Sequence, residues 1–140
     1  MNILLVEDDV LLARGMAKLI ERMSGHRVQV STDPEQIFRD CYGGKIDLIL
    51  MDINLPGARW QGENVSGADL SRALKADPQT HRTPIILLTA YAMNSERESL
   101  LKISEADEFQ MKPIADYDKL ILLINHLINQ PQSTSVNLGS

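Results

Sequence analysis

The sequence predicts an α/β fold in which one parallel β-sheet is covered by helices on both faces. Three unbroken apolar runs, residues 3–6, 48–51 and 85–88, are short and rich in Ile, Leu and Val. Runs of this kind are typical of strands buried on both faces. Amphipathic helical segments alternate with them along the chain, and such alternation favours right-handed crossovers between parallel strands.

In the first half of the chain, the run at residues 3–6 is followed by a helical segment. Its apolar residues recur at the spacing of one helix face: Leu12, Met16, Leu19, Ile20 and Met23. Val28 and Val30 alternate with polar residues, which predicts a strand at the edge of the sheet. Asp33 and Pro34 predict the start of the next helix, with Gln36 as a capping-box partner.

The second half continues this alternation. Ser95 and Glu98 give another capping-box signal, and Phe109 alternates with polar residues up to Met111, which predicts a second edge strand. The last helix has one apolar face: Tyr117, Leu120, Ile121, Ile124, Leu127 and Ile128. Because the first strand is strongly apolar, we place it centrally and predict a flavodoxin-like, doubly wound (βα)5 sheet with strand order 2-1-3-4-5.

Composition restricts the class of protein. With 140 residues the chain has the length of one domain, and its net charge of −5 argues against a nucleic-acid binder. The single cysteine, Cys41, excludes a disulfide framework. We find neither a run of the ~20 apolar residues that span a bilayer nor a signal peptide, so we expect a cytoplasmic protein without membrane insertion. We expect one domain over residues 1–129 and a flexible, uncharged tail over 130–140.

Polar residues follow the predicted strands where each strand ends. Since the carboxyl ends of parallel strands meet at one edge, these residues should lie together. They are Glu7, Asp8, Asp9, Asp52, Asn54, Thr89, Ala90, Lys112 and Pro113. Each has an ordinary structural alternative: Asp9 could be a helix N-cap, Asp52 a turn residue and Lys112 a solvated charge. As a set, they indicate a site built from carboxylates, a hydroxyl and an ammonium group.

This set resembles the response regulator receiver domain of two-component signalling, over about residues 1–129. Glu7-Asp8-Asp9 resembles the acidic pocket of that family, and Asp52 falls at its phosphoacceptor. Thr89-Ala90 matches the switch hydroxyl and the small residue after it, and Lys112-Pro113 matches the family's Lys-Pro pair. The stretch from Ala106 places Phe109 at the aromatic switch. The segments Thr89-Ala90-Tyr91-Ala92-Met93 and Lys112-Pro113-Ile114 resemble most closely those of single-domain receivers.

The resemblance implies a Mg²⁺ cofactor. Asp9 and Asp52 would bind the metal directly, the backbone carbonyl of Asn54 would be a third ligand, and Asp8 would act largely through water. Such a ligand set suits Mg²⁺, which uses one or two carboxylates, waters and phosphate oxygens. Clustered carboxylates also repel one another, and a divalent cation relieves that repulsion.

The resemblance further implies that Asp52 accepts a phosphoryl group from a histidine kinase or a histidine phosphotransfer protein. Lys112 and Thr89 would each contact a phosphoryl oxygen, and Phe109 would move as Thr89 is drawn inward. The expected protein is a stand-alone response regulator that signals through an unknown protein target. It would be no enzyme beyond accepting its own phosphoryl group and slowly losing it.

Asn54 and Tyr91 lie where the family tunes the phosphoaspartate lifetime. Dimerisation through the face from the fourth to the fifth helix stays open.

The sequence departs from the family in two places. The loop after Asp52 is long, because the expected glycine, Gly67, comes only fifteen positions later. The additional segment, residues 58–66, is either a tolerated surface insertion with Trp60 folded onto apolar surface or a docking element in which Arg59 and Trp60 anchor a partner. The second departure is Glu105, which stands where many receivers have glycine.

Three other classes of protein are weighed against this interpretation. A haloacid-dehalogenase-like phosphatase also uses an Asp nucleophile, but Asn54 takes the place of its second acid, and its nucleophile usually follows the first strand. A pseudo-receiver interaction module would not need Asp8, Asp9, Asp52, Thr89 and Lys112 intact. A nucleotide or flavin binder would need a Gly-rich phosphate loop after the first strand, where three acids stand instead.

Overall fold

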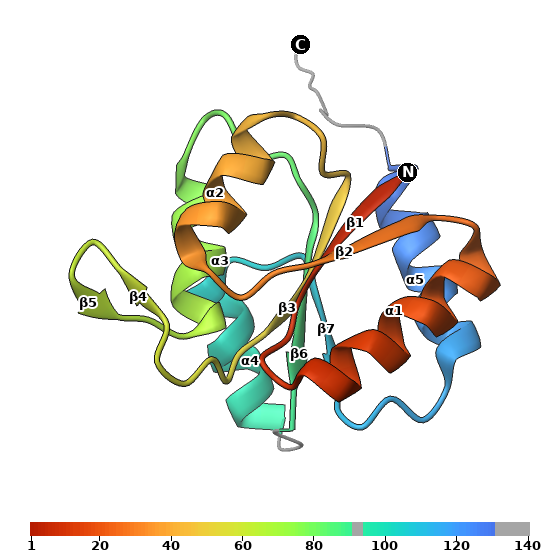
Figure 1. Cartoon of the computed structure of the whole chain (residues 1–140). Helices are drawn as coiled ribbons and strands as arrows, with labels where there is room; N and C mark the ends of the chain where they lie inside the picture. The colour runs from red at the N-terminus through yellow and green to blue at the C-terminus, as the bar shows by residue number, and fades with distance from the viewer. Residues whose placement is uncertain (91–93, 131–140) are drawn as a thin grey trace, which may run out of the picture.

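A computed structural model describes residues 1–90 and 94–130 of the chain (Figure 1). Five parallel strands form one sheet in the order β2-β1-β3-β6-β7. Because β4 and β5 form a separate hairpin, β6 and β7 are the fourth and fifth strands of this sheet, and the predicted order 2-1-3-4-5 is confirmed. These strands are β1 (Asn2–Val6), β2 (Arg27–Val30), β3 (Leu48–Asp52), β6 (Ile85–Thr89) and β7 (Glu108–Met111). The helices are α1 (Val10–Ser24), α2 (Pro34–Tyr42), α3 (Gly67–Ala76), α4 (Asn94–Ser104) and α5 (Tyr117–Ile128).

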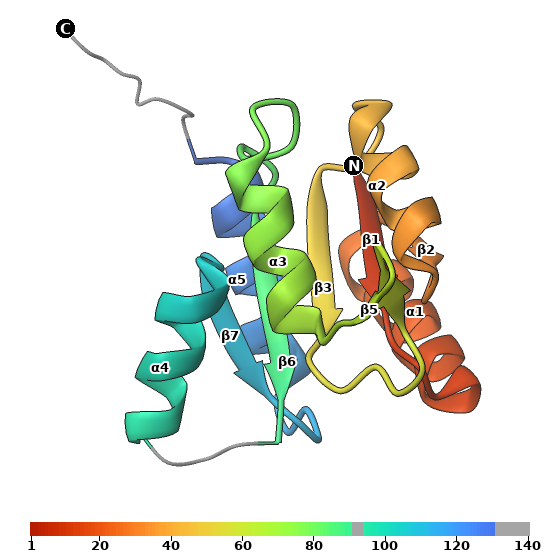
Figure 2. The ribbon, with the colours of Figure 1, turned by 90° about the vertical axis from the view of Figure 1, so that its left-hand side faces the viewer.

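Helices cover both faces of the sheet (Figures 1 and 2). On one face, α1 and α5 pack on Ile3, Leu5 and the neighbouring strands. On the other face, α2 and α3 pack on Leu4, Val6 and the inner strands, and α4 lies beside β7. The three apolar runs that predicted the sheet are fully buried, with 0% of their surface exposed. Burial on both faces explains why these runs are continuous and not alternating.

Local signals place the helix starts at the carboxyl edge of the sheet. Asp9 caps α1, with its side chain accepting a hydrogen bond from Leu12 N at 3.1 Å. Asp33 caps α2 and Pro34 is its first residue, as predicted. Gln36 does not complete a capping box, since its amide donates to Asp40 Oδ1 at 2.8 Å. The capping-box prediction at Ser95 concerns a side chain outside those that the structure describes.

A short β-hairpin occupies the segment after β3 that the sequence marked only as a long loop. Its strands are β4 (Arg59–Trp60) and β5 (Glu63–Asn64), paired antiparallel. The two residues between them, Gln61 and Gly62, both have positive φ, at 53° and 82°. Two positive φ angles are characteristic of the tight turns that match strand twist. The insertion is therefore an ordered element, and Figure 1 shows it projecting beside α2 and α3.

Glu105 lies just after α4 and has a φ of 56°, in the left-handed region. Its N–H donates to Leu101 O at 2.9 Å, which closes the end of the helix. This conformation is the one that glycine adopts most easily, so the turn forms with glutamate at a conformational cost. The structure thus gives the physical reason why glycine suits this position.

Candidate functional site

The residues predicted at the strand ends do converge on one edge of the sheet. A pocket of about 690 Å³ opens there. Its lining comes from the segments that follow β1, β3, β6 and β7, together with the start of α1 and the N-cap of α3. The lining residues are Glu7, Asp8, Asp9, Leu12, Asp52, Ile53, Asn54, Pro56, Ser66, Leu88, Thr89, Ala90 and Lys112.

Lys112 connects two buried carboxylates at the centre of this pocket. Its Nζ lies 2.8 Å from Glu7 Oε1 and 3.1 Å from Asp52 Oδ2. Glu7 and Asp52 are 3% and 4% exposed. One ammonium group shared by two carboxylates leaves an excess of negative charge in a poorly solvated place. This excess favours binding of a cation beside Asp52.

The protonation behaviour of both groups follows from this packing. Burial raises the pKa of the Asp52 carboxyl above its ordinary value of 3.8, the hydrogen bond from Lys112 opposes this, and the charge of Glu7 adds to it. For Lys112, burial alone would lower the pKa, but the hydrogen bonds to Glu7 and Asp52 and the charges of these carboxylates together outweigh burial and raise it. The lysine is therefore held as a cation next to a carboxylate whose charge is disfavoured.

The loop that carries Asp52 is fixed from two sides. Asn54 N donates to Asp52 Oδ1 at 3.3 Å, and Gly67 N donates to Ile53 O at 2.8 Å. A Cβ atom at Gly67 would lie only 1.9 Å from Asp52 O. The start of α3 can approach the end of β3 this closely only because residue 67 has no side chain. Gly67 thus helps to set the position of Asp52.

The three acids after β1 take three different positions. Glu7 Oε2 accepts a hydrogen bond from Asp9 N at 3.1 Å, while Oε1 contacts Lys112. Asp9 Oδ1 is engaged in capping α1. The carboxylate of Asp8 extends toward the loop after β3. Glu7 had no place in the ligand set that the sequence suggested, yet it is buried and pairs directly with Lys112.

The donor set fits a magnesium ion. No three His, Cys, Asp or Glu side chains among the described residues form a metal-binding group by themselves. Mg²⁺ needs no such group, since it keeps several waters and takes one or two protein carboxylates. Asp52 and Asp8 line the pocket as carboxylates, and Asn54 lines it beside them. The expected ligand Asp9 also lines the pocket, but its side chain serves the helix start.

Two further residues were predicted to take part in switching. Thr89 is the last residue of β6, is 3% exposed and lines the pocket. Phe109 on β7 is half-buried against the apolar cluster under α2 and α3, and the Arg97 guanidinium lies over its ring, 4.0 Å from the centroid. Tyr91, expected to influence the phosphoaspartate lifetime, lies outside the described residues.

The hairpin packs against α2 through its tryptophan. The rings of Trp60 and Phe38 are stacked, with centroids 4.2 Å apart and planes 8° apart. Arg59 is exposed and its guanidinium donates to Gly62 O across the turn. The structure therefore shows the Trp60 ring folded onto apolar surface, and leaves Arg59 as the exposed member of the proposed docking pair.

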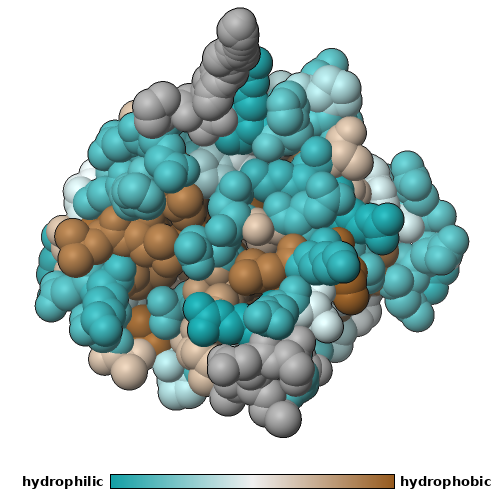
Figure 3. Space-filling view, turned by 180° about the vertical axis from the view of Figure 1, so that it is seen from behind, coloured by the Kyte–Doolittle hydropathy of each residue, from teal (hydrophilic) through white to brown (hydrophobic). Residues whose placement is uncertain are grey.

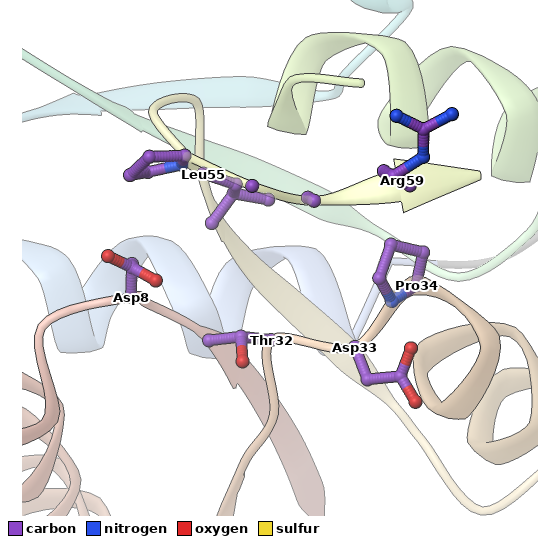
Figure 4. A pocket seen from close by; sticks show the side chains of 9 residues that line it. Asp8, Thr32, Asp33, Pro34, Leu55 and Arg59 are labelled. Carbon is purple, nitrogen blue, oxygen red and sulfur yellow. The ribbon is translucent and has the colours of Figure 1, made fainter. Parts of the chain in front are cut away.

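A second pocket, of about 330 Å³, lies between the base of the hairpin and the loops after β1 and β2. Figure 4 shows Asp8 directed across it toward Leu55, while the side chain of Arg59 points away from it. Asp8 lines both this pocket and the larger one. The insertion thus forms part of the surroundings of the acidic site.

Comparisons with known proteins agree with this geometry. Residues 3–125 match the response regulator receiver domain family. The transcriptional regulatory protein CpxR of Escherichia coli K12 is 35% identical over 137 residues, which cover 94% of this chain and 53% of CpxR. The chain spans about half the length of the curated relatives it matches first.

Solved structures show the same fold. The receiver domain of sensor histidine kinase PA1611 from Pseudomonas aeruginosa PAO1 is 29% identical, with a TM-score of 0.74, over 92% of this chain and 98% of that one. It is described with a magnesium ion coordinated in the active-site cleft. The receiver domain of a histidine kinase from Syntrophus aciditrophicus has a TM-score of 0.76 at 25% identity, over 99% of this chain and 98% of that one.

These matches determine what kind of module the chain is. Receiver domains are signalling modules that accept phosphoryl groups from histidine kinases and interact with partners. Within the described residues, no helix is long and apolar enough to cross a membrane. On the sequence match, the fold and the arrangement around Asp52 and Lys112, the chain belongs to the response regulator receiver domain family.

Proposed function

We propose that Asp52 is the phosphoacceptor of this receiver domain, with phosphohistidine of a histidine kinase or a phosphotransfer protein as the donor. The observation that carries the proposal is the Lys112 ammonium, which lies within 3.1 Å of the buried Asp52 carboxylate. A carboxylate beside a fixed cation, at the edge of a sheet and facing a pocket, suits in-line attack on phosphorus.

The transfer is an exchange of one bond for another. An Asp52 carboxylate oxygen attacks phosphorus, the P–N bond to the donor imidazole breaks, and the imidazole nitrogen keeps the electron pair. Lys112 stays paired with the negative oxygens through the transfer. The Thr89 hydroxyl, buried at the end of β6, donates to another phosphoryl oxygen.

Magnesium belongs to this proposal as the cofactor. Asp8 and Asp52 are its side-chain ligands and the backbone carbonyl of Asn54 is the third protein ligand. When bound, the ion neutralises charge that develops on the phosphoryl oxygens. Glu7 holds Lys112 in place, and Asp9 begins α1. This set replaces Asp9 with Asp8 as the direct ligand, because the Asp9 side chain caps the helix.

The output of the domain is contact with a protein partner through the side that bears α4, β7 and α5. Figure 3 shows a hydrophilic surface on this side with apolar groups gathered across its middle. Each of the three elements exposes a large apolar residue: Ile103, Met111 and Leu122. The same side is where a second copy of the chain could associate.

Intact mass after incubation with Mg²⁺ and acetyl phosphate tests the proposal. The wild type gains one phosphoryl group, and Asp52→Asn gains none. Asp118→Asn, which changes an exposed acid on α5, is the matched control and behaves as the wild type. EDTA added at the start abolishes the gain. Incorporation into Asp52→Asn equal to that of the wild type would overturn the assignment.

A further inference from the structure

The guanidinium of Arg97 lies over the ring of Phe109. Arg97 Cζ lies 4.0 Å from the ring centroid, well within the ~6 Å over which a guanidinium and an aromatic face attract each other. The Phe109 side chain also packs against the apolar cluster beneath α2 and α3. The position of the ring is therefore determined jointly by the core and by α4.

Over the part of α4 that the structure describes, the helix that carries Arg97 packs more against α3 than against the sheet. Among the described side chains of α4, Ser104 is buried and Leu100 packs partly against the core, whereas Ile103 is 52% exposed. Ser71 Oγ donates to Ser104 O, which fixes the carboxyl-terminal end of α4 to α3. The contact between Arg97 and Phe109 ties the amino-terminal half of α4 to β7.

Phe109 is also next to the site. In the register of β6 and β7, Leu87 is opposite Phe109 and Thr89 is opposite Met111. Thr89 and Phe109 are therefore diagonal neighbours on the same face of the sheet, close enough for an aromatic side chain to reach. In the same structure, Lys112 pairs with the Asp52 carboxylate. The Arg97–Phe109 contact thus accompanies the arrangement in which Lys112 pairs with the Asp52 carboxylate.

We propose that Arg97 is a positioning residue that holds Phe109 and the start of α4 in this arrangement, and so restrains the response of the site to a phosphoryl group. The inference rests on the proposed function and adds its regulation by one residue. If the contact stabilises one arrangement only, its loss shifts the equilibrium toward the other, and a ligand of that other arrangement binds more tightly.

For Arg97→Ala, the proposal predicts a loss of stability of α4, whereas helix propensity alone predicts no loss or a gain. Arg97 is near the amino-terminal end of α4, where a cation is disfavoured by the helix dipole, and alanine is the better helix former. If Arg97 were merely an exposed helix residue, Arg97→Ala would leave α4 equally or more stable. If it ties the helix down, the same change loosens α4.

Hydrogen exchange in metal-free buffer measures this directly. Amides of residues 97–104 should exchange about two- to fivefold faster in Arg97→Ala, the factor expected for loss of one exposed cation–π contact. Arg97→Lys keeps a cation and should restore most of the protection. Lys102→Ala removes a positive charge from the same helix without touching Phe109 and serves as the control. Unchanged or slower exchange in Arg97→Ala overturns the proposal.

The second measurement is the affinity for beryllofluoride, a phosphoryl mimic, in the presence of Mg²⁺. Arg97→Ala should bind it about two- to fivefold more tightly than the wild type. In a Phe109→Leu background, the substitution at Arg97 should have no further effect, because the ring it acts through is gone. Faster exchange without a change in affinity would show a structural contact and overturn the regulatory role.

These measurements distinguish failure of the proposed function from failure of the role of Arg97. If the wild type neither binds beryllofluoride nor gains a phosphoryl group, the proposed function fails. If the wild type does both and Arg97→Ala matches it in affinity, the function stands and the role of Arg97 fails.

Discussion

At the scale of single residues, the site depends on a glycine as much as on its charged groups. An alanine at Gly67 would bring Cβ to 1.9 Å from Asp52 O and 3.0 Å from Ile53 Cα, and both are backbone atoms that cannot rotate away. We expect Gly67→Ala to lower the free energy of unfolding by about 1–3 kcal/mol, the usual cost of overpacking. It should also slow phosphoryl incorporation, because Asp52 must move. Urea unfolding and the mass assay measure both.

Gly15 provides the matched control for this substitution. It lies within α1, and a Cβ there would meet nothing within 4 Å. Gly15→Ala should stabilise the protein by about 0.5–1 kcal/mol, since alanine is the better helix residue. If the two variants had equal stability, the close approach at Gly67 would not constrain the fold.

The charge of Asp52 is expected to reduce stability near neutral pH. Because burial raises its pKa in the folded state, the folded protein binds a proton more readily than the unfolded chain does, and this contribution to stability is lost as pH rises through the folded pKa. Without divalent cations, Asp52→Asn should therefore be more stable than the wild type at pH 7. The difference should vanish as pH falls below the ordinary value of 3.8.

Thermal unfolding over a pH series checks this prediction. Glu63→Gln, which changes an exposed carboxylate on β5, should shift stability by less than about 0.5 kcal/mol. Adding Mg²⁺ should stabilise the wild type and leave Asp52→Asn nearly unchanged. An Asp52→Asn variant less stable than the wild type at pH 7 would mean that Lys112 more than compensates for burial of the carboxylate.

The positions of the acids after β1 could be predicted from the sequence, but their separate roles could not. Their convergence with Asp52, Thr89 and Lys112 could be predicted, because apolar runs locate strand ends. The division of labour among them could not. Glu7 directly follows buried Val6 and is itself buried at the end of β1. Asp9 stands three residues before Leu12 and caps the helix. The sequence allowed Asp9 to be an N-cap, but it did not indicate that Asp8 would then replace Asp9 in the proposed set of metal ligands.

At the scale of elements, the hairpin β4–β5 packs on α2 through the stack of Trp60 on Phe38. Trp60→Ala removes the contact with Phe38 and should destabilise the protein by about 1–2 kcal/mol, since a stacked pair contributes beyond its buried area. Arg59→Ala should change stability by less than about 0.5 kcal/mol, because its side chain is exposed. Chemical unfolding of both variants measures the difference.

The same pair tests the docking hypothesis for the insertion. If Arg59 contacts the phosphodonor protein, Arg59→Ala weakens transfer from that protein and leaves phosphorylation by acetyl phosphate intact. Equal rates in both assays for Arg59→Ala and the wild type would make the hairpin a structural insertion alone. Trp60→Ala losing both activities equally would reflect disturbance of the loop after Asp52.

The hairpin is also the element that the sequence did not reveal. Its turn uses Gln61-Gly62, which lacks the Asn-Gly or Asp-Gly signature of such turns, and its strands are two residues long. The capping box at the start of α3, formed by Ser66 and Asp69, was also missed, although its Ser-x-x-Asp spacing is visible in the sequence. Short elements within a loop leave no periodic signal, whereas the five strands of the main sheet leave either an apolar run or an alternation.

At the scale of the whole molecule, the topology brings together side chains that lie far apart in the chain. Glu7 and Lys112 are 105 positions apart and are joined at 2.8 Å. The fold and strand order could be predicted because burial on both faces dictates the composition of the inner strands. The site then follows from parallel topology alone, and its chemistry from the charges collected at one edge.

The central claim is that Asp52 becomes an acyl phosphate, and locating the modified residue tests it most directly. The protein is phosphorylated with acetyl phosphate and Mg²⁺, reduced with borohydride, which converts an aspartyl phosphate to homoserine, and digested for peptide mass mapping. The account predicts homoserine at position 52 in the wild type and at no acid among residues 7–9. Homoserine at another position, or none after a measured phosphoryl gain, would contradict it.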